Sequence, residues 1–275
     1  MNRLAIIIGS PSSPKTPEAG KYLKGVKTDV ENIYGFLRSS IGGSWQENEL
    51  KIFSPNPNYS DVLPYLKACK DVDFAFVYFS GHGYTDTSDK GRVLFNPSQA
   101  PYIKYLATRA KRQITIIDAC RSYPEFIGFE GTTLIEGINF PNPKPEFARV
   151  VYDKYLSQIP ASRVLLHATS KGKFSKDYGT NYGGLFSTSL LSVVKNKLDT
   201  ENKPVFNVAE VFQTAKINTQ QSESTQVPQI YISNESAYRL PFAIKPDYKP
   251  QQIKSYDRFV NENLAEDIVK GALMS

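Results

Sequence analysis

Three apolar runs constrain the fold of this 275-residue chain most strongly: LAIIIGS (4–10), DFAFVYFS (73–80) and QITIID (113–118). Nearly continuous apolar runs of this length are typical of strands that are buried on both faces of a parallel sheet. Between these runs the apolar residues follow helical spacing, as at 26–41 and 60–70. Strands that alternate with helices predict an α/β domain with a mostly parallel sheet covered by helices.

The rest of the chain continues this alternation up to about residue 240, with one interruption. We expect strands at 49–54, 91–96, 163–170 and 229–233, and helical segments at 99–111, 185–198 and 207–219. The interruption is 121–162, which contains several prolines and is predicted to be a long loop. The tail, 241–275, is predicted to contain an amphipathic helix that either docks on the domain or binds a partner. Its apolar stripe consists of Phe259, Val260, Leu264, Ile268 and Val269.

Composition excludes several classes of protein. No apolar stretch reaches the roughly 18–20 residues of a membrane span, and the apolar run near residue 4 is too short for a signal peptide, so we expect a cytoplasmic protein. Two cysteines and two histidines do not make a disulfide framework and disfavour a structural zinc site. The net charge is +6, but the basic residues are scattered, which disfavours a dedicated nucleic-acid-binding role.

Two of the apolar strands end in residues that carry chemistry. DFAFVYFS leads into Gly81-His82-Gly83, and QITIID leads into Ala119-Cys120. Open parallel sheets place their sites at the carboxyl ends of the strands, so an imidazole and a thiol are expected to lie together there. Such a pair has the components of an activated nucleophile. The other cysteine and histidine, Cys69 and His167, are interpreted as structural residues within the core.

At this point the chain resembles a known family. FVYFSGHG (76–83) and ITIIDACRS (114–122) resemble the histidine and cysteine motifs of caspase-like peptidases, which include caspases, metacaspases and bacterial relatives. Asp118 and Ser122 stand where true caspases have Gln and Gly, so the resemblance is to metacaspase-type and bacterial members. Three further segments resemble the family in the family's own order: GVKTDVENIYGFL (25–37), HATSKGKFSKDYGTNYGGLFSTSLL (167–191) and QVPQI (226–230).

The resemblance covers about residues 1–235 and implies a fold and a domain division. The family fold is a six-stranded, mostly parallel sheet with helices on both faces. By resemblance, residues 1–240 form the peptidase domain and 241–275 form a separate tail. The domain divides into a large-subunit-like part (1–121), an intersubunit-type loop (122–162) and a small-subunit-like part (163–240).

The resemblance also implies the catalytic roles. Cys120 is the expected nucleophile that forms an acyl-enzyme, and His82 is the expected general acid and base. The expected oxyanion hole consists of the main-chain N–H groups of Gly83 and Cys120. No third member of a triad is identified.

The pocket for the residue before the scissile bond is acidic in metacaspases, and its residues have counterparts here. They are Asp29, Ser80 and Asp118, with Val26 where the family has cysteine. Two carboxylates in a partly desolvated pocket favour a cationic side chain, which predicts cleavage after Arg or Lys. The alternatives are a solvated position for Asp29 and a capping role for Asp118.

Regulation and partners follow from the resemblance alone. Self-cleavage within 122–162 suits a basic-specific protease at Lys144, Arg149 or Lys154, and the alternative is an ordinary long insertion. The expected partners are protein substrates and an activating protein, in a bacterial defence or cell-death pathway, with a monomer favoured. No metal or cofactor is expected, and calcium activation has no support in the sequence. The other interpretations are a catalytically silent scaffold, a clostripain-like or separase-like protease, and a basic nucleic-acid-binding protein.

Overall fold

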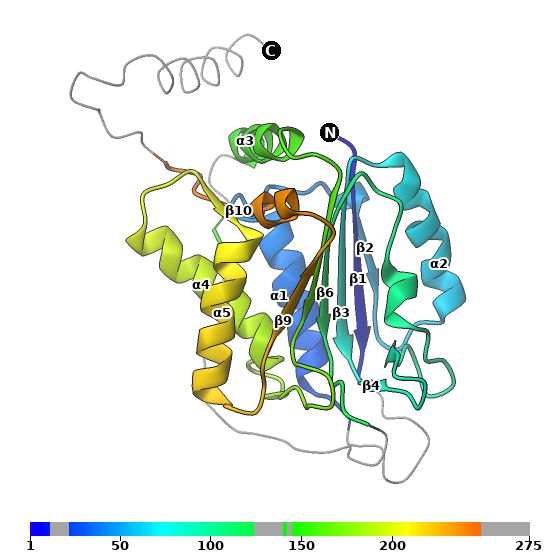
Figure 1. The fold of residues 1–275 in the computed structure, drawn as a ribbon. Coiled ribbons are helices and arrows are strands. Elements are labelled where there is room, and N and C mark those ends of the chain that lie inside the picture. Colours follow the sequence, from blue (N-terminus) through cyan, green and yellow to red (C-terminus); the bar gives the residue numbers. More distant parts are fainter. Residues whose placement is uncertain (12–21, 124–139, 142–144, 249–275) are drawn as a thin grey trace, which may run out of the picture.

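Six strands form one central sheet in the computed structural model, which describes residues 1–11, 22–123, 140–141 and 145–248. The strand order is β2-β1-β3-β6-β7-β9, and only β9 is antiparallel to its neighbour. Figure 1 shows the strands side by side, with helices on both faces of the sheet. The predicted six-stranded, mostly parallel sheet is therefore confirmed. The strands are β1 (Arg3–Ser10), β2 (Leu50–Phe53), β3 (Phe74–Gly81), β6 (Arg112–Asp118), β7 (Ser162–His167) and β9 (Gln229–Ile232).

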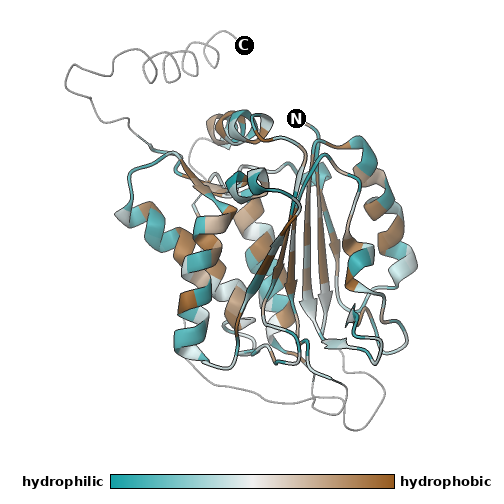
Figure 2. Ribbon diagram, viewed as in Figure 1, coloured by the Kyte–Doolittle hydropathy of each residue, from teal (hydrophilic) through white to brown (hydrophobic). Residues whose placement is uncertain are grey.

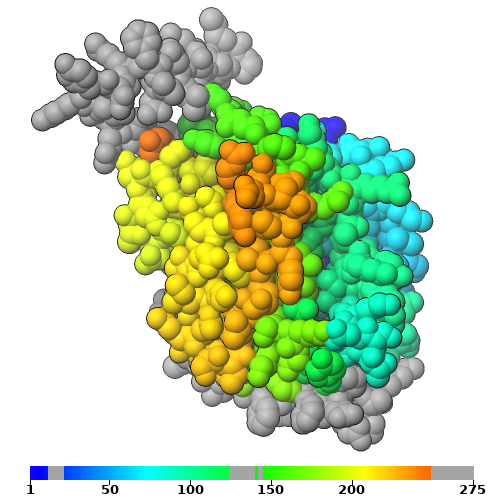
Figure 3. Space-filling model, in the orientation of Figure 1, coloured from blue at the N-terminus to red at the C-terminus, as the bar shows by residue number. Residues whose placement is uncertain are grey.

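The three apolar runs form the centre of this sheet. Every residue of β1, β3 and β6 is buried, as expected where helices or loops cover both faces. Figure 2 shows the apolar colour concentrated on these central strands. Figure 3 shows the last strand of the sheet, β9, at the molecular surface (orange), between the helices α4 and α5 (yellow) and the N-terminal half of the domain.

Helices pack on the two faces as separate layers. On one face lie α1 (Gly25–Arg38), α4 (Leu185–Thr200) and α5 (Val208–Ser222), which share one apolar core with the sheet. On the other face, α2 (Tyr59–Ala68) contributes Val62 and Leu66 to a second core. The predicted helices at 26–41, 60–70, 185–198 and 207–219 are all present, with ends shifted by a few residues.

The helical spacing at 99–111 is misleading, because only a short 3₁₀ segment, η3 (Ile103–Leu106), forms there. The chain is diverted by side-chain hydrogen bonds. Gln113 Oε1 accepts from both the N–H and the Oγ of Thr108, and Thr108 Oγ accepts from the N–H of Ala110. These bonds replace the i to i−4 pattern that a helix requires. The predicted strand at 91–96 is shorter than expected and pairs, as β5 (Gly91–Val93), with β4 (Gly83–Thr85).

The predicted loop at 121–162 is wrong in its second half, which contains the helix α3 (Pro145–Ser157). Proline at the first position of a helix is favourable, since its missing N–H has no partner there in any case. The buried residues of α3 follow helical spacing: Ala148, Val151, Tyr152 and Leu156. The prolines of this stretch therefore flank the helix and do not interrupt it.

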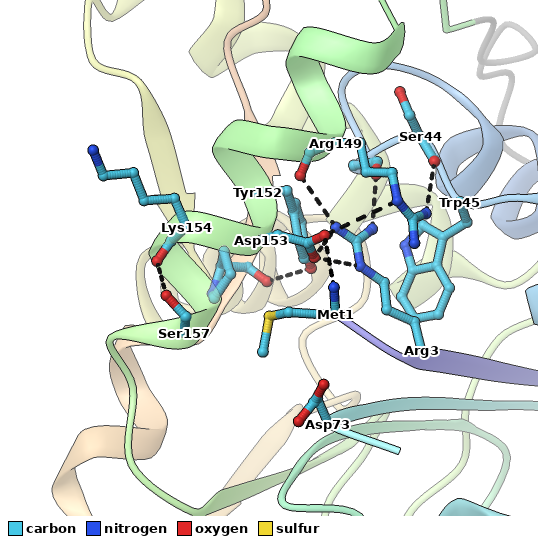
Figure 4. Close-up of polar contacts among 12 residues, drawn as sticks. Met1, Arg3, Ser44, Trp45, Asp73, Arg149, Tyr152, Asp153, Lys154 and Ser157 are labelled. Carbon is cyan, nitrogen blue, oxygen red and sulfur yellow. Dashed lines mark hydrogen bonds and ion pairs between the residues drawn. The ribbon is translucent and has the colours of Figure 1, made fainter. Parts of the chain in front are cut away.

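A cluster of buried polar contacts fixes α3 to the start of β1 (Figure 4). The Arg3 guanidinium donates to Asp153 Oδ1 at 2.8 Å and to the Gly43 carbonyl at 2.8 Å. Its central carbon lies 4.8 Å from the ring centroid of Tyr152 and 5.3 Å from that of Trp45. The side chain of Arg3 is fully buried, so these contacts replace the interactions with water that the guanidinium makes in the unfolded chain.

The same helix bears on the predicted cleavage positions. Arg149 lies within α3 and donates to both carboxylate oxygens of Glu49, at 2.8 and 2.6 Å, while Lys154 lies in the last turn of α3. A helical segment with a paired arginine does not present an extended strand to a protease, so these two positions are poor cleavage sites. Lys144 lies outside the described residues.

The domain extends a few residues beyond 240. Strand β10 (Pro241–Ile244) is buried and pairs antiparallel with β8 (Val205–Asn207), so the tail begins later than predicted. The predicted amphipathic helix of the tail lies outside the described residues. None of the helices in the described ranges is long and apolar enough to cross a membrane.

Candidate active site

His82 and Cys120 follow two neighbouring parallel strands, and the register of these strands places them together. In the pairing of β3 with β6, Ser80 is the partner of Asp118, and the histidine and cysteine each lie two residues further along. The two segments that follow β3 and β6 stay adjacent beyond the strands, because the Thr85 N–H donates to the Ser122 carbonyl at 2.9 Å. The two segments are therefore adjacent at the carboxyl edge of the sheet, and the meeting of the two side chains stays a prediction.

The two segments approach each other closely at Gly83. A Cβ on this residue would lie 2.7 Å from the carbonyl oxygen of Cys120 and 2.9 Å from the Cβ of Ala119. Only glycine fits this contact without a shift of the backbone. The main chains of Gly83 and Cys120, whose N–H groups are the predicted oxyanion donors, therefore lie against each other.

The thiol of Cys120 is held by the main chain of Ser175. The Ser175 N–H donates to Sγ at 3.3 Å, and Sγ lies 3.5 Å from the Ser175 carbonyl oxygen, which accepts the thiol proton. Burial raises the pKa of the Cys120 thiol to about 11, and the Ser175 N–H opposes that rise. At neutral pH the cysteine is therefore a thiol, which requires a base to become a nucleophile.

Asp29 and Asp118 lie in one buried cluster with Ser80. Ser80 Oγ donates to Asp29 Oδ2 at 2.6 Å, and the Gly184 N–H donates to Asp29 Oδ1 at 2.8 Å. Only 2% of Asp29 and 5% of Asp118 is exposed, so a solvated position for Asp29 is wrong. A Cβ on Gly184 would lie 2.4 Å from Asp118 Oδ2, which shows how closely the loop backbone fits against both acids.

Asp118 accepts three hydrogen bonds. Oδ2 accepts from the N–H of Ser187 at 2.9 Å and from its Oγ at 2.7 Å, and Oδ1 accepts from Ser175 Oγ at 2.8 Å. Ser187 is the third residue of α4, so Asp118 does cap a helix N-terminus, where a negative charge is stabilised. The capping interpretation is thus confirmed for this residue and is compatible with a role in the pocket.

The two carboxyl groups share an unfavourable environment. The pKa of Asp29 is raised well above its ordinary value, first by burial and then by the charge of Asp118. Burial also raises the pKa of Asp118, but its hydrogen bonds from Ser187 and Ser175 oppose the rise. Asp29 is therefore the carboxyl group that keeps its proton more readily, and Asp118 is the better-stabilised anion.

Val26 lies one turn before Asp29 on α1 and is buried, and its place in the pocket stays a prediction. A third carboxylate, Asp177, was not among the predicted residues, and its charge raises the pKa of both Asp29 and Asp118. Asp177 Oδ2 accepts from the Gly25 N–H at 3.1 Å, which joins its loop to the start of α1.

Three other residues of the site were not predicted: Ser175, Ser187 and Gln226. All three lie in segments that resemble the family, but no periodic pattern marks them individually. The available signal was the concentration of small and polar residues between 167 and 191.

Other residues behave as structural ones. Cys69 is buried in the second core, and burial raises the pKa of its thiol to about 11. His167 is buried and packs edge-on against the ring of Tyr231, and burial lowers the pKa of its imidazole to about 3. Among the described residues, no group of three or more His, Cys, Asp or Glu side chains is arranged to hold a metal ion.

The fold and this site together define a cysteine peptidase of the caspase class. The family described as Caspase domain matches residues 2–238, nearly the whole chain. The chain therefore belongs to the caspase-domain family and is a cysteine-type peptidase, which is a hydrolase.

Solved structures agree on the fold. Caspase-1 from Spodoptera frugiperda is 14% identical, with a TM-score of 0.53, and the match covers 84% of this chain and 86% of that one. Protein GSU0716 from Geobacter sulfurreducens is 16% identical, with a TM-score of 0.51, and the match covers 86% of this chain and 97% of that one. No curated protein matches the chain.

Proposed function

We propose that this chain is an endopeptidase in which His82 and Cys120 act as a catalytic dyad and cleave proteins after Arg or Lys. The observation that carries the proposal is the placement of two buried carboxyl groups, Asp29 and Asp118, beside the segment that bears the cysteine. The family resemblance implies that a side chain bound at Asp118, which lies two residues before Cys120, belongs to the residue before the scissile bond.

In the proposed reaction, His82 takes the proton of the Cys120 thiol, and the sulfur attacks the carbonyl carbon of the scissile bond. The main-chain N–H groups of Gly83 and Cys120 stabilise the negative charge on the carbonyl oxygen. The imidazolium then gives its proton to the leaving amine, and a thioester remains on the cysteine. Water, deprotonated by His82, hydrolyses this thioester and releases the free thiol.

The acidic cluster supports the preference for a basic residue. An arginine or lysine brought beside Asp29 and Asp118 relieves the repulsion between them, and an arginine can bind a carboxylate with two hydrogen bonds. A substrate aspartate would instead add a further negative charge to a buried acidic site. Ser80 and Val26 complete the proposed pocket. Ser80 donates a hydrogen bond to Asp29, and Val26 is a buried apolar residue on α1, one turn before Asp29.

In the structure, hydrogen bonds from Ser175, Ser187 and Gly184 occupy the carboxylates, and the Ser175 main chain occupies the thiol. We propose that a partner protein, or cleavage between β6 and α3, moves the segment around Gly184 away from Asp29 and opens the pocket, while the Ser175 main chain stays at the sulfur. A working place in a reducing compartment, the cytoplasm, fits the two free cysteines, Cys69 and Cys120.

The proposed mechanism uses side chains and main-chain groups of the chain alone, without a cofactor. A peptidase assay with calcium and with a chelator tests this expectation. A role in bacterial defence or cell death is proposed from the family resemblance. It predicts that expression of an activated wild-type protein, but not of Cys120→Ala, stops bacterial growth.

The test uses the purified full-length chain and two fluorogenic peptides that differ only in Arg or Asp before the scissile bond. We expect wild type to cleave the Arg peptide and Cys120→Ala to cleave neither. Cleavage of the Asp peptide alone would retain the protease and overturn the acidic pocket. Binding of a protein partner by wild type and Cys120→Ala alike, with no cleavage even in its presence, would favour the scaffold interpretation.

A further inference from the structure

The side chain of Gln226 is completely buried, and each of its polar atoms is used. Oε1 accepts from the Lys176 N–H at 2.9 Å. Nε2 donates to the Ala168 carbonyl at 3.1 Å and to Ser175 Oγ at 3.2 Å. Gln226 lies just before β9, so one amide ties the segment before the last strand to the loop that follows β7. A buried amide that is fully satisfied in this way fixes the backbone around it.

The segment held by Gln226 touches the functional groups of the site directly. The Ser175 N–H donates to Cys120 Sγ, and Ser175 Oγ donates to Asp118 Oδ1. The Lys176 carbonyl accepts from the N–H of Leu185, the first residue of α4, which holds the segment from its other side. The loop at Ser175 and Lys176 therefore contacts both the thiol and the proposed specificity carboxylate, and Gln226 sets its position.

We propose that Gln226 is a positioning residue for Cys120, which holds the Ser175 main chain where its N–H donates to the sulfur. An N–H that donates to sulfur stabilises the thiolate more than the thiol and therefore favours ionisation. This effect outweighs that of the Ser175 carbonyl, which accepts from the thiol at the longer distance of 3.5 Å, so the net effect of the Ser175 main chain is to lower the pKa of the thiol. The hydrogen bonds of Gln226 go to Lys176, Ala168 and Ser175, so its proposed effect on the sulfur passes through Ser175. The inference deepens the proposed function, because it rests on Cys120 as the nucleophile.

Several other charged groups surround the thiol and stay constant when Gln226 is changed. Asp118 on the same strand opposes ionisation of the thiol, and Lys176 on the loop favours it. His82 follows the neighbouring strand, and Arg121 is the next residue in the chain. A change of Gln226 to an uncharged residue alters none of these charges, so a displaced thiol titration reports the lost position of Ser175.

The test compares Gln226→Met with Gln229→Met in the full-length protein. Methionine keeps the approximate volume of glutamine and removes its hydrogen bonds. Gln229 is a matched control, because it lies in the same segment and its side chain donates to the Val227 carbonyl at 3.2 Å, away from the site. Alkylation of Cys120 by iodoacetamide is followed by mass spectrometry of its peptide, over the pH range in which thiols titrate.

We expect Gln226→Met to displace the midpoint of alkylation upward by about one pH unit, the size of one lost hydrogen bond to a charged group. Gln229→Met should keep the wild-type midpoint. A variant that only exposes the thiol more to iodoacetamide would raise the maximal alkylation rate at high pH and would leave the midpoint pH unchanged. A wild-type midpoint in a folded Gln226→Met protein would overturn the proposal.

Gln226→Asn is the second variant, in case Gln226→Met does not fold. Asparagine is uncharged and keeps an amide, but its side chain is one methylene shorter and cannot make all three hydrogen bonds of Gln226, so the midpoint should again move upward, and an unmoved midpoint contradicts the proposal. The alkylation profile does not depend on substrate. Lack of cleavage of the Arg peptide by wild type would therefore count against the proposed function, while the alkylation midpoint still decides the role of Gln226.

Discussion

Replacement of Asp29 by asparagine should stabilise the protein while it removes activity. Asp29 is buried, and its pKa is raised well above the ordinary value by burial and by the charge of Asp118. An asparagine can keep both hydrogen bonds, since its oxygen accepts from the Gly184 N–H and its amide donates to Ser80 Oγ, which is an acceptor as well as a donor. The substitution thus removes the free-energy cost of a buried carboxyl group without leaving a polar group unpaired.

The sign of the pH dependence follows from the direction in which the pKa moves. Because the folded chain holds the Asp29 proton to a higher pH than the unfolded chain, wild-type stability falls as pH rises from about 3.8 through the raised folded pKa. A tenfold change in a protonation equilibrium corresponds to about 1.4 kcal/mol. Burial of an imperfectly compensated polar group costs about 1–3 kcal/mol, so Asp29→Asn should gain a free energy of unfolding of this order at neutral pH. In a chain of this size, with an unfolding entropy of about 2.1 cal/mol/K per residue, the gain raises the melting temperature by roughly 2–5 °C.

The assay is thermal unfolding, followed by circular dichroism, of wild type, Asp29→Asn and Asp61→Asn at acidic and neutral pH. Asp61 is an exposed aspartate in α2 and serves as the control. The melting temperature of Asp29→Asn should exceed that of wild type by more at neutral pH than near pH 4. A difference that stays constant with pH, or that has the opposite sign, would refute the reasoning about the buried pair. With the Arg peptide, Asp29→Asn should show a large loss of kcat/KM.

Three further predictions concern single residues. His82→Ala and Cys120→Ala should each lower the cleavage rate by at least about 100-fold with little change in melting temperature, and a normal rate in either variant would exclude the dyad. Gly83→Ala should reduce kcat strongly, because its Cβ would lie 2.7 Å from the Cys120 carbonyl, whereas an unaffected kcat would show that the two segments separate easily. Burial lowers the pKa of His167 to about 3 in the folded chain, below the 6.5 of the unfolded chain, so wild-type stability should fall by about 1.4 kcal/mol for each pH unit between 6.5 and about 3. His167→Phe should flatten this decline in urea unfolding, and an identical decline in both proteins would rule out His167 as its source.

The centre of the fold could be predicted from the sequence because its signal is local. The runs that form β1, β3 and β6 are apolar over their whole length, and parallel strands end at one edge, which brings the segments that carry His82 and Cys120 to the same edge of the sheet. The helix α3 was not predicted because the prolines near it indicate breaks, although its buried residues do follow helical spacing. The 3₁₀ segment at 103–106 was not predicted because the hydrogen bonds that Thr108 donates to Gln113 have no periodic signature.

The detailed surroundings of the cysteine depend on contacts between distant parts of the chain. Ser175 and Gln226 reach the site from loops that lie 50 or more residues from their partners in sequence. Hydrophobic periodicity carries no information about such pairs, because each is a polar residue in an irregular segment. The roles of Ser175 and Gln226 follow only from the three-dimensional positions of their donor and acceptor atoms.

The attachment of α3 to Arg3 has a consequence for any cut made in the chain between β6 and α3. The new C-terminal fragment would begin near α3. Arg3 of β1 binds this helix through a hydrogen bond to Asp153 and a cation–π contact with Tyr152. The same piece carries β7, which is hydrogen-bonded along its length to β6 of the other piece. A nicked chain should therefore migrate as one particle in gel filtration and separate into two fragments only in denaturant, so that cutting alters connectivity without dispersing the site.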